Sequence, residues 1–140
     1  VTDAVADLLF VSEPSGEENL LREGISSKRI HFVGNVMIDS LSYFLGKAES
    51  SKALEKYNLE QSNYVLVTLH RPSNVDSEEQ LSKIVSMLNS VARKRKIIFP
   101  IHARTKSNMD RYSLSDKIDS NVIISDPIGY LDFLSLLNNA

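Results

Sequence analysis

Short apolar runs alternate with longer amphipathic stretches along the whole chain, and this alternation constrains the fold more than any other feature. Most of the short runs are apolar throughout, as expected for strands that are buried on both faces of a parallel sheet. The pattern therefore predicts an α/β fold with a parallel sheet. The predicted strands span residues 7–11, 30–33, 64–69, 96–101 and 121–124.

Capping signals place two helices in the connections between these strands. Ser15 with Glu18, and Ser77 with Gln80, have the spacing of a capping box, and Gly24 fits the C-terminal stop of the first helix. The second helix is predicted to pack through a single apolar stripe. That stripe consists of Leu81, Ile84, Val85, Leu88, Val91 and Ala92.

A basic run, residues 93–96, follows the apolar stripe directly. Cations at the C-terminal end of a helix complement its macrodipole. The alternative is a nucleic-acid-binding patch, but no aromatic residue lies within the run and the net charge of the chain is −2. We therefore favour the helix-end interpretation and expect no nucleic-acid partner.

The connection between residues 39 and 63 is longer and more polar than the others, as a linker helix between two lobes would be. We therefore predict three parts: a minor N-terminal piece at 1–40, an interdomain helix or linker at 41–63, and the main unit at 64–140.

Composition excludes several classes of protein. The chain has 140 residues, of which 42% are apolar and 24% charged, which is the balance of an ordinary globular protein. The longest apolar run falls well short of the roughly 20 residues that span a bilayer, so we expect no membrane segment. The absence of cysteine suits a reducing compartment, and we expect a cytoplasmic protein.

Imidazole and guanidinium side chains follow two neighbouring predicted strands. His70 and Arg71 come directly after the strand at 64–69, and His102 follows the strand at 96–101. Ligands of open α/β sheets bind beyond the carboxyl ends of the strands. A guanidinium fits phosphate oxygens, and an imidazole can donate a hydrogen bond or move a proton. The pattern predicts a site for a diphosphate-bearing ligand, although surface loops are polar in many proteins.

Other kinds of site have little support in the sequence. The three histidines are too far apart to share a metal-ligand spacing, and no glycine-rich phosphate loop is present. His31 lies within an apolar run, which favours a structural role over a catalytic one. We therefore predict no metal site and no catalytic role for His31.

Six blocks of sequence, in order and covering nearly the whole chain, resemble one enzyme family. They are residues 2–11 (TDAVADLLFV), 18–24 (ENLLREG), 33–39 (VGNVMID), 66–71 (LVTLHR), 99–102 (FPIH) and 126–133 (DPIGYLDF). Together they are similar to the non-hydrolysing UDP-N-acetylglucosamine 2-epimerases.

The resemblance implies a Rossmann-like parallel sheet within a two-lobed, glycosyltransferase-B-type architecture. Residues 1–40 would end the N-terminal lobe and residues 64–140 would form the first half of the C-terminal lobe. Members interconvert UDP-N-acetylglucosamine and UDP-N-acetylmannosamine by eliminating and re-adding UDP. They need neither a metal nor a nicotinamide cofactor, and they are commonly homodimers.

The resemblance also implies roles for five residues. His70 matches a histidine that lies at the diphosphate and does acid–base work. Phe133 and the backbone at Ile128 match positions that hold the uracil. Arg71 and His102 match positions that, in bacterial members, bind a second UDP-N-acetylglucosamine as an allosteric activator.

The chain departs from the family pattern in two ways. Many bacterial members read His-Arg-Arg-Glu-Asn where residues 70–74 read His-Arg-Pro-Ser-Asn. The N-terminal phosphate-contacting segment, the carboxylates that handle the C2 proton and the later Asp-Ser-Gly-Gly segment are not in these 140 residues. We therefore expect the middle third of an epimerase, inactive when isolated. The alternatives are a nucleotide-sugar-binding or assembly module without catalysis, and a lobe of a UDP-sugar glycosyltransferase.

Overall fold

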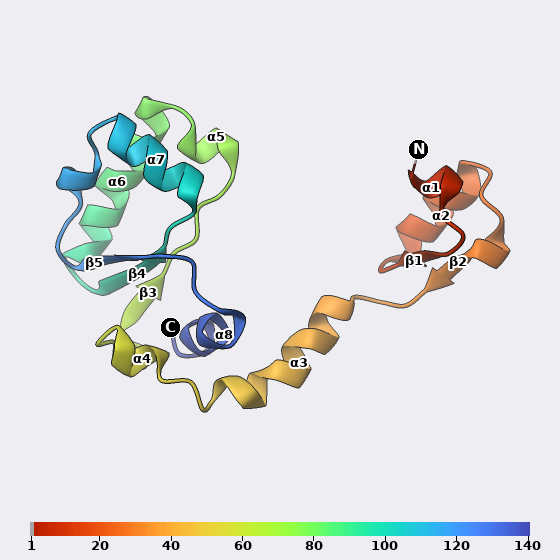
Figure 1. Cartoon of the computed structure of the whole chain (residues 1–140), viewed down its shortest axis with the longest axis horizontal. Helices are drawn as coiled ribbons and strands as arrows, with labels where there is room; N and C mark the ends of the chain where they lie inside the picture. Colours follow the sequence, from red (N-terminus) through yellow and green to blue (C-terminus); the bar gives the residue numbers. More distant parts are fainter. Residues whose placement is uncertain (1) are drawn as a thin grey trace. The chain divides into compact units, whose positions relative to one another are not determined.

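The computed structural model describes residues 2–140, which form two compact units with their boundary between Gly46 and Lys47 (Figure 1). Helix α3 (Val36–Ala48) runs across that boundary. Each unit contains its own parallel sheet, so the predicted parallel α/β class is confirmed.

The first unit is built around a two-stranded parallel sheet. Strand β1 (Leu9–Val11) pairs with β2 (Ile30–Phe32), and Leu9 lies opposite Ile30. Both of these residues are buried, and helix α2 (Pro14–Arg22) connects the strands. Helix α1 (Thr2–Val5) precedes β1, and a 3-10 turn, η1 (Ser27–Arg29), leads into β2.

The two ends of α2 test the capping predictions differently. The predicted capping box at Ser15 is wrong: the N-cap residue is Glu13, whose side chain makes no capping bond, and Pro14 occupies the first helical position. Proline is favoured there because its ring fixes φ at a helical value and its missing N–H is not needed. The predicted stop at Gly24 is confirmed, since Gly24 has φ +85° and donates to the Leu21 carbonyl at 3.0 Å.

The second unit contains a three-stranded parallel sheet in the order β3-β4-β5. Strand β3 (Tyr64–Leu66) pairs with β4 (Lys96–Pro100), which pairs with β5 (Val122–Ser125). The remaining elements are α4 (Ala53–Lys56), α5 (Pro72–Val75), α6 (Glu78–Ala92), α7 (Ala103–Arg111), η2 (Ser115–Lys117) and α8 (Tyr130–Asn138).

The middle of the central strand β4, residues 97–99, is apolar because both of its faces are buried. Ile97 and Phe99 belong to a core cluster with residues of α6 and α7, whereas Ile98 belongs to a second cluster with Ala53 of α4 and Leu136 of α8. Figure 1 shows α6 and α7 on one side of the sheet and α4 and α8 on the other. The second unit therefore has three layers, and its chain changes face after β5.

Helix α6 begins as the sequence predicts. The Ser77 hydroxyl accepts the Gln80 N–H at 3.2 Å, which confirms this cap. Leu81, Val85, Leu88 and Ala92 of the predicted stripe are buried, while Val91 at its edge is 37% exposed. The helix ends at Ala92, so the basic run lies at its C-terminal end as predicted.

Tyr64, at the start of β3, joins this sheet to α8. Its hydroxyl donates a hydrogen bond to the Leu136 carbonyl, and burial raises the pKa of the Tyr64 hydroxyl above its usual value.

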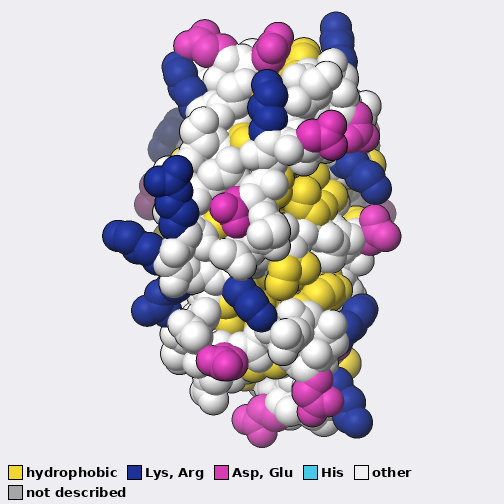
Figure 2. Space-filling model, turned by 90° about the vertical axis from the view of Figure 1, so that its left-hand side faces the viewer, with side chains coloured by type: hydrophobic (Ala, Val, Ile, Leu, Met, Phe, Trp, Pro, Cys, Tyr) yellow, Lys and Arg dark blue, Asp and Glu magenta, His cyan; other side chains and the backbone are white. Residues whose placement is uncertain are grey.

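The outer surface has mixed charge. On the face shown in Figure 2, lysine and arginine side chains are interspersed with aspartate and glutamate, and hydrophobic patches lie between them. Between residues 2 and 140, no helix has the length and apolar character needed to cross a membrane.

Candidate functional site

The carboxyl ends of β3, β4 and β5 meet at one edge of the second unit's sheet, and the predicted polar residues follow these ends. Residues 67–71 leave β3, His102 follows β4 by two residues, and Asp126 follows β5 directly. Because β3 and β4 are adjacent and parallel, the His70–Arg71 segment and His102 lie after neighbouring strands. This edge is where open α/β sheets bind ligands.

His70 and Arg71 are both exposed at this edge. Strand β3 is shorter than the predicted 64–69, because the chain leaves the sheet after the Val67 N–H donates to the Ile98 carbonyl at 3.0 Å. Arg71 is the N-cap residue of the short helix α5 and makes no side-chain capping bond. Among residues 2–140, neither side chain has a recorded hydrogen-bond or ion-pair partner, which leaves both available to a ligand.

His102 is the N-cap residue of α7, and this role fixes the tautomer of its ring. Its Nδ1 accepts the backbone N–H of Arg104 at 3.2 Å. An acceptor nitrogen carries no proton, so the neutral ring has its proton on Nε2. The exposed His102 ring therefore presents Nε2–H as a hydrogen-bond donor, which suits a phosphate or carbonyl oxygen.

Ile128 and Phe133 lie beyond β5, on the segment where the chain changes face. Both are partly buried, and Ile128 packs against the cluster that contains Ile98. Phe133 is in the first turn of α8, where its N–H donates to the Gly129 carbonyl at 2.9 Å. The first turn of α8 is also tied to the chain before α4, because the Asp132 carboxylate accepts the Ser51 hydroxyl at 2.6 Å.

The structure also shows contacts near the site that the sequence did not predict, although the Arg104 guanidinium follows β4 in the same pattern as Arg71 follows β3. Asp76 forms a bidentate ion pair with Arg104, at 2.7 and 2.6 Å, and the Thr105 hydroxyl donates to the Leu69 carbonyl at 3.1 Å. These contacts hold the segment that carries His70. Their partners are 28 and 36 residues apart in the chain, so the only available signal was the polar character of the residues after β4.

His31 belongs to the first unit. It lies on β2, is exposed, and has its ring centroid 5.8 Å from that of Phe10. The His31 ring lies beside the aromatic ring of Phe10. The structural role that the apolar sequence around His31 favours stays a prediction. In the described part of the chain, residues 2–140, no three histidine, aspartate or glutamate side chains are grouped so that they could hold a metal ion.

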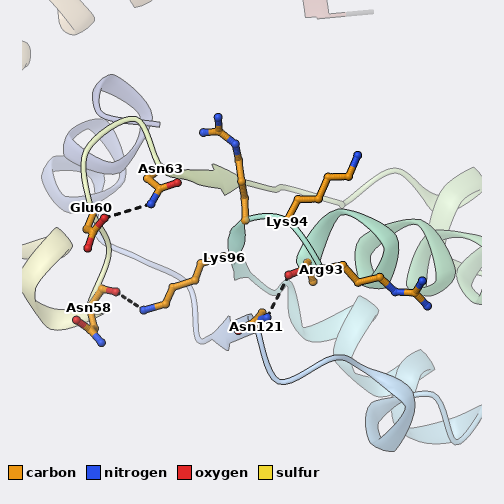
Figure 3. Close-up of a pocket in the computed structure, with 9 residues that line it drawn as sticks. Asn58, Glu60, Asn63, Arg93, Lys94, Lys96 and Asn121 are labelled. Carbon is orange, nitrogen blue, oxygen red and sulfur yellow. Dashed lines mark hydrogen bonds between the residues drawn. The ribbon is translucent and has the colours of Figure 1, made fainter.

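A pocket of about 380 Å³ lies at the opposite edge of the sheet, where β3, β4 and β5 begin (Figure 3). The basic run lines it, but two of its four cations are already bound to backbone carbonyls. Arg95 donates to the Ser62 carbonyl and Lys96 to the Asn58 carbonyl, both at 2.7 Å. Figure 3 shows Arg93 and Lys94 extending away from Asn58. The basic run therefore fastens the loop before β3 to the start of β4.

Known proteins place this chain in a family. Residues 1–140 match the family model described as UDP-N-acetylglucosamine 2-epimerase. The chain is 38% identical over 147 residues to the UDP-N-acetylglucosamine 2-epimerase of Methanococcus maripaludis. It is 36% identical over 143 residues to the UDP-2,3-diacetamido-2,3-dideoxy-D-glucuronate 2-epimerase of Pseudomonas aeruginosa. These alignments cover 100% of the chain and 40% and 38% of the two relatives.

Solved structures agree with the sequence comparison. The Methanocaldococcus jannaschii UDP-GlcNAc 2-epimerase, in complex with UDP-GlcNAc and UDP, is 36% identical, with a TM-score of 0.80. The match covers 99% of this chain and 40% of that one. A family model that matches every residue, together with this shared fold, is decisive: the chain belongs to the UDP-N-acetylglucosamine 2-epimerase family.

Proposed function

We propose that the chain is the central part of an enzyme that interconverts UDP-N-acetylglucosamine and UDP-N-acetylmannosamine. The observation that carries this proposal is the placement of His70, Arg71 and His102 after neighbouring parallel strands, in a chain of this family. The chain spans about 40% of the length of the curated relatives that it matches, so the activity is proposed for the full-length protein. We expect the isolated 140-residue chain to show no turnover.

His70 is the proposed catalytic residue and also contacts the diphosphate of UDP. Elimination breaks the bond between C1 of the sugar and the diphosphate oxygen, while C2 gives its proton to a carboxylate expected in the rest of the full-length enzyme. The electron pair of the C2–H bond forms a double bond between C1 and C2. Negative charge develops on the departing UDP, and a donor directed at that oxygen lowers the barrier. Re-addition of UDP reverses these steps with the proton delivered to the other face of C2. An imidazole can donate and accept protons near neutral pH, as both directions require.

Ile128 and Phe133 are the proposed uracil contacts, through the Ile128 backbone and the Phe133 ring. Their place beyond β5, at the carboxyl edge of the sheet that carries His70, supports this assignment. An aromatic ring packs well against a nucleobase.

Arg71 and His102 are proposed to bind a second UDP-N-acetylglucosamine as an activator. The exposed guanidinium of Arg71 and the Nε2–H of His102 are both donors suited to diphosphate oxygens. The residues Pro72 and Ser73 stand where many bacterial members have arginine and glutamate, so this contact would use fewer charges here.

The test is epimerisation by the full-length protein in D₂O, followed by proton NMR. Conversion of UDP-N-acetylglucosamine to UDP-N-acetylmannosamine that carries deuterium at C2 supports the proposal, and absence of conversion refutes it. His70→Ala should lower kcat by roughly 10²- to 10⁴-fold, because general acid–base catalysis contributes this much. His31→Ala, on the other unit, is the matched control and should keep the wild-type rate. A fully active His70→Ala enzyme would remove His70 from the mechanism.

The relative from P. aeruginosa supplies a second candidate substrate. Its name specifies a UDP-linked diacetamido glucuronate, and its identity to this chain, 36%, is close to that of the first relative. The same assay with that sugar nucleotide decides between the two. Faster turnover of the glucuronate would move the proposal to that substrate.

The wider setting is also part of the proposal. We place the enzyme in the cytoplasm, as a homodimer that supplies polysaccharide biosynthesis, with a UDP-sugar as its ligand and no nucleic-acid or membrane partner. The net charge of −2 and the mixed surface charge support a small anionic ligand over nucleic acid. Sedimentation of the full-length protein tests the dimer, and a monomer at micromolar concentration would contradict it.

A further inference from the structure

One side of α7 and the residue after its end bind both ends of the segment that carries His70 and Arg71. Thr105, which is 0% exposed, donates its hydroxyl to the Leu69 carbonyl at 3.1 Å, immediately before His70. Asn108 donates its side-chain amide to the Val75 carbonyl at 2.9 Å, at the end of α5. The eight residues from 69 to 76 are therefore held at their two ends, with the exposed pair near the first.

Asp76 receives the largest number of these contacts. Its carboxylate accepts both Nε and a terminal nitrogen of Arg104, at 2.7 and 2.6 Å, and its backbone carbonyl accepts the Tyr112 hydroxyl at 2.8 Å. A bidentate guanidinium–carboxylate pair fixes direction as well as distance. The neighbouring Val75 is 0% exposed within the core. This end of the segment is therefore held by packed side chains as well as by hydrogen bonds.

The spacing of these residues explains how one element can make all the contacts. Arg104, Thr105, Asn108 and Tyr112 are separated by one, three and four residues, which places the last three along one side of a helix. Their partners run from Leu69 to Asp76 along a segment of which only residues 72–75 are helical. Such a loop would sample many conformations without tertiary contacts.

We propose that Arg104, Thr105, Asn108 and Tyr112 are positioning residues that hold His70 and Arg71 in their ligand-binding geometry. The inference rests on the proposed function for its kinetic consequence. It goes further by assigning that geometry to contacts made from α7 and Tyr112. None of the four needs to touch the substrate. Misplacing a reacting group by about 1 Å can cost on the order of 10²-fold in rate, so a loosened segment has a large expected effect.

The first experiment measures amide hydrogen exchange and histidine side-chain NMR in the 140-residue chain. Its three histidines give few enough imidazole signals to assign. In Arg104→Ala, exchange should accelerate about tenfold or more at residues 73–76 and the His70 signal should shift. Exchange in β4 and the His31 signal should stay unchanged. A purely global loss of stability would accelerate exchange in β4 as well, and that result would overturn the inference.

Lys83→Ala is the matched control. It breaks a different ion pair, in which Lys83 and Glu79 lie 2.6 Å apart on the exposed face of α6. It should leave the His70 signal in place. Thr105→Val removes the hydroxyl that binds the Leu69 carbonyl and should also shift the His70 signal. If this buried variant fails to fold, Tyr112→Phe removes a single hydroxyl from a partly exposed position and tests the Asp76 end of the segment, which Arg104 also binds. Thr105→Ser keeps the hydroxyl and should restore wild-type exchange.

The second experiment measures kinetics in the full-length protein. Arg104→Ala should lower kcat roughly ten- to hundredfold while KM changes much less, since the substrate contacts themselves remain. An unchanged kcat, or wild-type exchange at residues 73–76, overturns the positioning role. If the wild-type protein turns over no UDP-sugar, the proposed function fails, and the exchange experiment alone then decides whether the segment is held as proposed.

Discussion

Replacing His102 separates its two proposed roles, because one variant removes both and another removes only one. In His102→Ala, the first turn of α7 loses the Nδ1 acceptor that binds the Arg104 N–H. In His102→Asn, the side chain can still cap the helix, since asparagine is among the best N-cap residues. The Asn variant nevertheless lacks the Nε2–H that the histidine presents to a ligand.

The expected loss of stability follows from the cap. Removing an N-cap acceptor costs about 1 kcal/mol. With a urea m-value of roughly 2 kcal/mol/M for a protein of this size, the midpoint for the second unit should fall by about 0.5 M. The loss reaches the core because Thr105 and Met109, the buried residues of α7, lie one and two turns beyond the cap.

The assay is a urea titration followed by the methyl signals of methionine in the 140-residue chain. Met109 is 1% exposed and reports on the second unit, whereas Met37 is 75% exposed on α3. We expect a lower midpoint at Met109 for His102→Ala and a wild-type midpoint for His102→Asn. In the full-length protein, both variants should lose activation by UDP-N-acetylglucosamine. Equal destabilisation by the two substitutions would refute the capping argument.

Three further predictions concern the sheet of the second unit. Tyr64→Phe should remove a fall in stability above about pH 10: burial raises the pKa of Tyr64, so the unfolded chain releases the proton first and stability declines as pH rises. Titration of stability against pH checks this, and an unchanged decline contradicts it. Ile98→Ala should cost about 2–5 kcal/mol in urea unfolding, whereas Ile124→Ala, 38% exposed, should cost much less. Lys96→Met should accelerate amide exchange in residues 58–63 by freeing the Asn58 carbonyl, and unchanged exchange would refute this tether.

The sequence predicts best where one physical requirement dominates. The central strand is recognisable because Ile97, Ile98 and Phe99 must be apolar to be buried on both faces. The roles of Gly24 as a helix stop and Ser77 as an N-cap are equally predictable, since a positive φ and an N-cap each favour a narrow set of residues. The false capping box at Ser15 shows the limit: Pro14 begins that helix one residue earlier by a different local rule.

The site itself can be predicted only in part from the sequence. The strand-end rule predicts where His70 and His102 lie, because it depends on local order along the chain. It carries no information about what orients them. That information lies in contacts such as Thr105 to Leu69, which join residues 36 positions apart and exist only after the sheet has formed. The premature end of β3 has the same origin, since the Leu69 carbonyl binds a hydroxyl of α7 instead of a strand.

Helix α7 therefore links the stability of the second unit to the geometry of its site. The helix is capped by the His102 ring, places Met109 in the core, and carries the Arg104 guanidinium that binds Asp76. A change that frays its first turn would release the Leu69 carbonyl and so reach His70 without touching it. Helix α6 differs, because Asn89 donates its side-chain amide to the Lys117 carbonyl and accepts the Asp119 N–H. Both of these long-range bonds lead away from the carboxyl edge. Destabilising α6 and α7 to the same degree should thus affect ligand binding unequally, with the larger effect from α7.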